Sequence, residues 1–207
     1  AADHSITRRR SHLGPHGIPA DRRSLGYVRR VDPAAVDLHR FRHAARRAKE
    51  AADDRSALAL LDEAAGLWRG EPLAGLSSPW LDTMRDHLEA ERWAVELDRT
   101  DVMLRTGRHS ECLAELSAQA AAHPLDERLA GQVLLALYRC GRPADALGHY
   151  QRTRRLLAEE LGTDPGPALR ALHQRILSGD RTLDLPTATG TSLSGPGAGG
   201  AARPSPL

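Results

Sequence analysis

Aromatic residues are scarce in this sequence, and features of membrane-spanning or secreted chains are missing. Phe, Trp and Tyr make up 3% of the 207 residues, so a core must be built mainly from Leu, Ala and Val. No apolar run approaches the roughly 20 residues that a membrane span requires, and no signal-peptide pattern opens the chain. Two cysteines without a wider framework favour a reducing compartment. We therefore expect a cytoplasmic protein with no membrane partner.

Motifs of the common catalytic and cofactor-binding sites are also missing. The sequence has no nucleophile elbow, P-loop, dinucleotide fingerprint or HExxH motif. His39 and His43 have the i, i+4 spacing of metal ligands, but arginines flank both and no third ligand is evident. Cys112 occupies a packing position and Cys140 precedes a turn, which favours structural thiols over a redox pair. We expect neither an enzyme nor a bound cofactor or metal.

The net charge of +2 hides an uneven distribution of charge along the chain. Residues 1–50 carry 12 basic and 5 acidic residues, whereas residues 51–180 carry 15 basic and 21 acidic ones. A basic front on an acidic body can contact nucleic acid. A tail that stays disordered, or packs on an acidic neighbour, is the interpretation we favour. We therefore expect this arm to contact DNA weakly or only indirectly.

Apolar spacing and helix-capping residues predict a chain of helices. Leu38, Phe41, Ala45 and Ala48 make one stripe at helical spacing. Gly and Pro punctuate the segments between such stripes. The expected helices cover about 34–50 and 55–68, a long segment opened by Ser78-Pro79 and closed by Gly107, about 109–122 and 126–139, a segment from Pro143 to Gly162, and a last one that carries Leu169, Leu172 and Ile176.

One phrase occurs twice at a fixed interval. "LRTGRHSECLAEL" begins at residue 104 and "LYRCGRPADALGHY" at residue 137, and Gly107 and Gly141 are 34 positions apart. Thirty-four residues is the period of a tetratricopeptide-type helical hairpin, whose turn requires a glycine with positive φ. The small residue that follows each turn lets the next helix pack closely, and a large residue four positions on fills the gap. The repeat positions are Gly107, Cys112, Leu116, Pro124, Gly141, Ala146 and Tyr150.

These patterns predict an all-α fold, a tetratricopeptide-like array of about seven helices with disordered N- and C-terminal segments. Residues 1–25 are expected to be an irregular basic arm, and 34–180 the helical module. Residues 181–207 are rich in Gly, Pro, Ser and Thr, which cannot bury enough apolar surface to fold. Between arm and module, "GYVRRV" at 26–31 suits a short strand. The sequence predicts no second strand with which this one could pair.

The order of three motifs separates this chain from a generic tetratricopeptide protein. "LWRGEPL", "HPLDERL" and "ELGTDPGPALRALHQRIL" follow one another in a stretch from about Gly26 to Asp180. In this order they resemble the bacterial transcriptional activator domain of the Streptomyces antibiotic regulatory protein family. In that family the domain follows a winged-helix DNA-binding domain. The segment "GYVRRVDP" at 26–33 resembles the last strand of that DNA-binding domain. Only 25 residues lie upstream here, so we expect the DNA-reading part to be absent from this chain.

The resemblance implies a function through binding. It implies a transcriptional regulator, or a fragment of one, that activates antibiotic and other secondary-metabolite biosynthesis. The implied partners are a winged-helix DNA-binding domain, RNA polymerase or another protomer. A free-standing tetratricopeptide-like adaptor, which binds a peptide or protein and has no role at promoters, remains the alternative.

Polar residues around the two repeated turns form a candidate partner-binding face. In helical-hairpin arrays such a face can grip an acidic or extended peptide. Alternatively, its arginines pair with Asp145, with Glu111 or with carbonyl groups at helix C-termini. For any single residue we favour internal pairing, and for the face as a whole both interpretations stay open. The candidate residues are Arg105, Arg108, Tyr138, Arg139 and Arg142.

Overall fold

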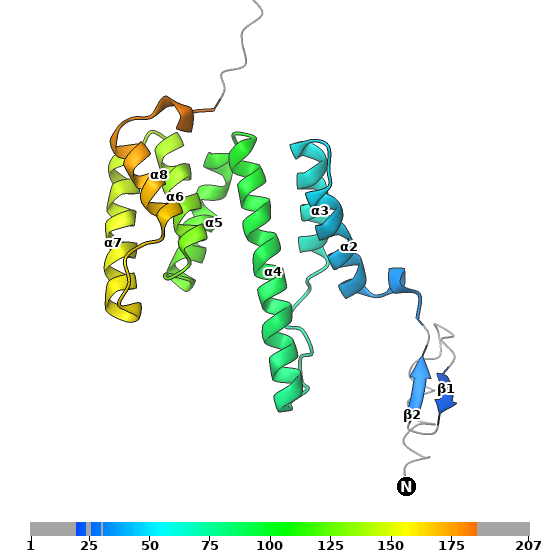
Figure 1. Cartoon of the computed structure of the whole chain (residues 1–207). Coiled ribbons are helices and arrows are strands. Elements are labelled where there is room, and N and C mark those ends of the chain that lie inside the picture. The colour runs from blue at the N-terminus through cyan, green and yellow to red at the C-terminus, as the bar shows by residue number, and fades with distance from the viewer. Residues whose placement is uncertain (1–19, 24–25, 30, 186–207) are drawn as a thin grey trace, which may run out of the picture.

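Seven α-helices follow one another along the described chain and pack side by side (Figure 1). The computed structural model describes residues 20–23, 26–29 and 31–185. The all-α array of about seven helices is thereby confirmed, whereas the predicted disorder of 1–19 and 186–207 lies outside the described residues. The helices are α2 (Asp37–Lys49), α3 (Asp54–Gly66), α4 (Pro79–Arg105), α5 (His109–Ala122), α6 (Glu127–Arg139), α7 (Pro143–Leu161) and α8 (Pro167–Leu177), with short 3-10 turns η2 (Pro33–Ala35) and η3 (Arg181–Leu183).

The predicted strand near residue 26 is present, but it has a partner. Strand β2 (Gly26–Arg29) pairs antiparallel with β1 (Ala20–Arg23), so that Ala20 lies opposite Arg29. The expectation of an entirely irregular arm over 1–25 is therefore wrong for 20–23. An isolated strand would leave its backbone N–H and C=O groups without partners, and β1 supplies them.

The 34-residue phrase corresponds to the same turn formed twice. Gly107 follows α4 with φ of 82° and Gly141 follows α6 with φ of 72°. After α4, the Arg108 N–H donates to Met103 O over 2.8 Å, and after α6 the Arg142 N–H donates to Leu137 O over 2.9 Å. This bond, together with the bond from each glycine N–H to the carbonyl three residues before it, defines a Schellman helix end. Both turns need glycine because an L side chain is strained at positive φ.

The other repeat positions pack as the spacing predicts. Cys112 and Ala146, in the first turns of α5 and α7, are buried, as are Leu116 and Tyr150 one turn later. Pro124 lies exposed in the connection between α5 and α6. The core therefore runs along the array, where each hairpin packs on its neighbour.

Helix α4 is much longer than the helices beside it. Its 27 residues span about 40 Å at 1.5 Å per residue, whereas the 13 residues of α3 span about 20 Å. Figure 1 shows the N-terminal half of α4 reaching well past α2, α3 and α5. At the start of this half, beyond the helices that cover Leu88, Trp80 is exposed to solvent.

The ordered module continues past its predicted C-terminal limit. Leu183 is 3% exposed and belongs to the core. Its backbone carbonyl accepts a hydrogen bond from Arg139 Nε over 2.8 Å. The prediction of a tail that starts at residue 181 is therefore wrong for 181–185. Leu183 is buried in the core, and Arg139 binds its backbone carbonyl.

Truncating Leu183 should destabilise the module although the residue lies beyond the last α-helix. Leu183→Ala removes a buried side chain and should lower the free energy of unfolding by about 2 to 5 kcal/mol. Leu177→Ala is the matched control, because Leu177 is exposed and the same change there should cost less than about 0.5 kcal/mol. Urea unfolding followed by circular dichroism measures both free energies. Equal losses of stability in the two variants would contradict the buried position of Leu183.

Candidate protein-interaction surfaces

Two arginines of the predicted face pair with carboxylates in their own helical turn. Arg108 Nη2 lies 2.6 Å from Glu111 Oε2, and Arg142 Nε lies 2.7 Å from Asp145 Oδ2. The hydrogen bond from Arg108 holds the pKa of the Glu111 carboxyl below its ordinary value. These pairs are themselves 34 residues apart, so the repeat extends to its charges. For both arginines, internal pairing is confirmed.

The other two arginines occupy equivalent repeat positions but differ in their partners. Arg105 binds the Asp54 carboxylate of α3, with Nη2 2.8 Å from Oδ1. Arg139 instead donates to the backbone carbonyls of Leu104 and Leu183. Burial lowers the pKa of the Arg139 guanidinium, and the nearby Asp184 carboxylate acts in the opposite direction. Arg139 therefore ties the C-terminal end of α4 to the segment after α8.

The structure distributes the predicted face over different hollows. Arg105 lines a hollow between α2, α3 and α4, and Arg142 lines one between α5, α6 and α7. Tyr138 and Arg139 line a third, together with Leu185. A role of the five residues in partner binding thus stays a prediction, and they do not line a single hollow.

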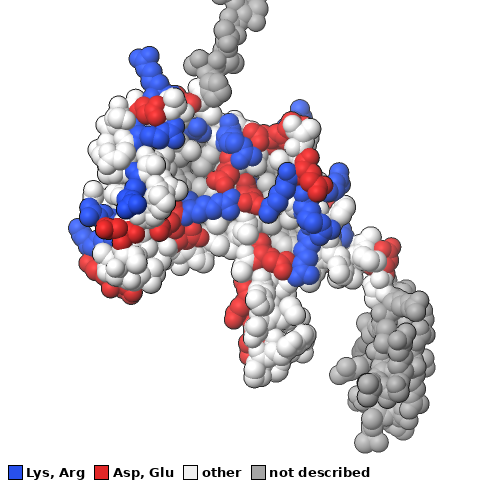
Figure 2. Space-filling view, in the orientation of Figure 1, with Lys and Arg blue, Asp and Glu red and all other residues white. Residues whose placement is uncertain are grey.

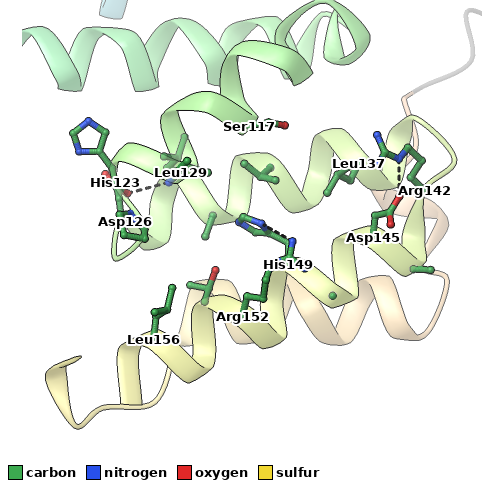
Figure 3. Close-up of a pocket in the computed structure, with 18 residues that line it drawn as sticks. Ser117, His123, Asp126, Leu129, Leu137, Arg142, Asp145, His149, Arg152 and Leu156 are labelled. Atoms are coloured by element: carbon green, nitrogen blue, oxygen red, sulfur yellow. Dashed lines mark hydrogen bonds and ion pairs between the residues drawn. The ribbon is translucent and has the colours of Figure 1, made fainter. Parts of the chain in front are cut away.

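The groove between α5, α6 and α7 measures about 500 Å³ (Figure 3). Leu129, Val133 and Leu137 of α6 line it with apolar surface. Small residues of α5 and α7 also line it, and His149 and Arg152 stand at its α7 side. An apolar floor with a polar rim suits an extended or helical peptide segment.

A second surface, at the end of α4, was not anticipated from the sequence. Trp80 is 67% exposed and Leu76, in the loop before the helix, is 54% exposed. Along α4, Leu88 is buried, Met84 is partly buried and Trp80 is exposed, at successive intervals of four residues. One apolar stripe therefore runs from the core out to solvent, past the last helix that covers it. Large exposed aromatic residues of this kind mark protein contact sites.

Arg85 fixes the loop that presents this surface. Its guanidinium donates to the carbonyl oxygens of Pro72, Leu73 and Leu76, over 3.2, 3.5 and 3.0 Å. It also lies 2.9 Å from Glu71 and 2.8 Å from Asp82. Within the described chain, Leu73 is the non-glycine residue with positive φ, 59°. Backbone strain of this kind persists only where surrounding contacts impose it. The loop is therefore held in one conformation with Leu76 outward.

We refer to Leu76, Trp80 and Met84 as the α4 tip. The motif "SSPW" was visible in the sequence, with Ser78 capping the helix through a 3.2 Å bond from the Leu81 N–H. What the sequence did not reveal is that α2 and α3 end too soon to cover Trp80.

Cys112 has the buried position of a structural thiol, and the two histidines of α2 lie on the surface. Burial raises the pKa of the Cys112 thiol, which therefore stays protonated. His39 and His43 are both exposed on α2. Over residues 31–185 and the two short strands, no three His, Cys, Asp or Glu residues are arranged to hold a metal ion. In that same part of the chain, no helix is long and apolar enough to cross a membrane.

Comparison with known proteins identifies the array. The family model of the bacterial transcriptional activator domain matches residues 36–177. The chain belongs to this family. The resemblance drawn from the three motifs is thereby confirmed, and the matched range coincides with the helices from α2 to α8.

Relatives of this activator domain include named regulators. Regulatory protein AfsR of Streptomyces griseus is 43% identical over 183 residues, which cover 87% of this chain and 19% of that protein. Regulatory protein DnrI of Streptomyces peucetius is 35% identical over 193 residues, 89% of this chain and 71% of DnrI. The chain thus spans about a fifth of AfsR and more than two thirds of DnrI.

A solved structure shares the fold of this activator domain. It is that of Mycobacterium tuberculosis EmbR in complex with a low affinity phosphopeptide, at a TM-score of 0.79 and 32% identity. The match covers 86% of this chain and 49% of that one. The helical array is therefore the arrangement found in a transcriptional regulator of known structure.

Acidification should weaken the activator domain before its carboxylates titrate. Burial, and then the neighbouring Arg152 and Arg154 respectively, lower the pKa values of His149 and His173. His173 also stacks on Tyr150, with ring centroids 3.7 Å apart. The unfolded chain therefore binds more protons than the folded one near and below pH 6.5, and stability falls as pH drops through this range.

Urea unfolding at pH 7.5 and pH 5.5 measures this loss. The pair His149→Gln and His173→Gln should reduce the difference in unfolding free energy between the two pH values. The exposed pair His39→Gln and His43→Gln controls for the loss of two histidines. A pH dependence that survives the first pair unchanged would contradict the assignment.

Proposed function

We propose that this chain is the protein-contact module of a transcriptional activator of the Streptomyces antibiotic regulatory protein type. The observation that carries the proposal is the family match over residues 36–177, with relatives named as regulatory proteins over most of this chain. The module acts at promoters of secondary-metabolite genes by binding and without catalysis. Its place of action is the cytoplasm, where bacterial genes are transcribed.

The α4 tip is the surface that we assign to the transcription machinery. Trp80 and Leu76 lie exposed on a loop and helix start that Arg85 has already ordered. A rigid aromatic anchor loses little conformational entropy when a partner covers it. RNA polymerase, a DNA-binding domain or a second protomer would thus find a preorganised apolar contact.

A free-standing adaptor is the second candidate, and the groove between α5, α6 and α7 favours it. That groove has the shape and lining for a peptide, and its use would require no promoter. The two candidates differ in whether the chain stimulates transcription when it is held at a promoter.

Tethering the chain to a promoter tests the proposal. The full chain is fused to an unrelated DNA-binding domain whose operator lies upstream of a reporter gene in a Streptomyces host. We expect several-fold stimulation of the reporter, which Trp80→Ala should abolish or reduce at least threefold. Interface anchors of this type cost about 2 kcal/mol or more when truncated.

Leu161→Ala serves as the control, because Leu161 is 57% exposed on α7, away from the α4 tip. It should leave the stimulation intact. A fusion that accumulates and binds its operator without stimulating the reporter would favour the adaptor. If Trp80→Ala and Leu161→Ala reduced the stimulation equally, the α4 tip would not be the contact surface, but the proposed activator function would stand.

A further inference from the structure

Helix α2 has one apolar face and one strongly basic face. Phe41, Ala44 and Ala48 are buried against the module. The helix carries five Arg or Lys residues and one acidic residue, Asp37. Its solvent side presents a row that we call the α2 ridge, all of whose members are exposed: His39, Arg40, His43, Arg46 and Arg47. Figure 2 shows Lys and Arg side chains gathered over this helix.

Charge on the α2 ridge is largely unneutralised. At the edges of the helix, Arg42 lies 2.7 Å from Glu91 and Lys49 lies 3.8 Å from Asp98. Across the described residues, Arg46 and Arg47 have no carboxylate within the 4.0 Å of an ion pair. Most other arginines of the helical array are paired, including all of those on α4. Positive charge without a partner therefore accumulates on this face.

The carboxylates nearest the α2 ridge do not interrupt it. Asp37 is at the start of the helix, 4.0 Å from Arg40 and 3.4 Å from Arg69. Glu50 caps the other end. The middle of the ridge, from Arg40 to Arg47, carries only positive or titratable basic groups on its outer side.

Helix stability explains only part of this arrangement. Basic residues in the last turn of a helix interact favourably with its dipole, which accounts for Arg46 and Arg47. Arg40 and His43 lie outside the last turn and gain nothing from it. A binding role accounts for the whole row.

The chemistry of the ridge selects the kind of partner. It contains no large apolar or aromatic side chain, which a protein interface needs as an anchor. Phosphate contacts need only positive charge and donors. From Arg40 to Arg47 the helix rises about 10 Å, the length of about three base pairs of duplex DNA at a rise of 3.4 Å each along its axis.

We propose that the α2 ridge binds the phosphate backbone of duplex DNA without reading its sequence. The contact goes beyond the proposed protein-contact function and does not depend on it. It belongs to a folded helix of the module, whereas the sequence predicted only a weak or indirect contact from the basic residues 1–50 as a whole. In a DNA-bound regulator, the ridge would add affinity and fix the orientation of the module on the duplex.

Titration of a fluorescently labelled duplex of about 20 base pairs with the full chain tests this assignment. Anisotropy is followed between about 50 and 200 mM salt for the wild type and for Arg46→Gln with Arg47→Gln. The control is Arg155→Gln with Arg170→Gln, an exposed pair on α7 and α8 that removes the same charge and has no carboxylate partner among the described residues. Thermal unfolding by circular dichroism checks that each variant is folded.

The ridge variant should bind several-fold more weakly at low salt, and its salt dependence should lose about two units of slope. The control should keep the wild-type slope. Equal weakening by both pairs would show that binding follows net charge and would overturn the proposal. So would an unchanged slope in the ridge variant, or displacement of DNA by an equal charge concentration of poly-glutamate, which would indicate an acidic protein partner.

Discussion

Burial of α6 is the constraint on which the rest of the array depends. Seven of its 13 residues are buried, and its polar residues bind α4, the start of α8 and the segment beyond α8. Gln132 Nε2 donates to Leu97 O of α4 over 2.8 Å, and Glu127 accepts from the Gly166 N–H over 2.6 Å at the start of α8. Arg139 reaches the segment beyond α8. Since an unpaired polar group in such a place is costly, these bonds fix where α4 and α8 lie.

The repeat shows how one sequence phrase acquires different roles. The two turns have the same backbone bonds and the same short-range ion pairs, because these depend on residues within one or two helical turns. Arg105 and Arg139 share a repeat position, yet one binds a carboxylate and the other two backbone carbonyls. Their neighbours come from distant parts of the chain, α3 in one case and the segment after α8 in the other.

The surfaces assigned to partners both lie in the N-terminal half of the module. The α4 tip is apolar and rigid, whereas the α2 ridge is polar and positively charged. Apolar anchors suit a protein with a complementary pocket, and unpaired arginines suit a polyanion. An activator that holds DNA and a protein at once needs both kinds of contact, and α2 and α4 are neighbours joined by the Arg42–Glu91 pair at 2.7 Å.

The sequence by itself determined the helices, their ends and the repeated turn. Ser78, Gly107 and Pro143 specify local backbone conformations, and apolar spacing specifies which face of each helix is buried. Tertiary structure alone decided that Trp80 lies exposed, that Leu183 is buried and that Arg139 has no carboxylate partner within the described chain. The physical reason is one of range. Capping and turn formation act within a few residues, whereas exposure and pairing depend on where neighbouring helices begin and end.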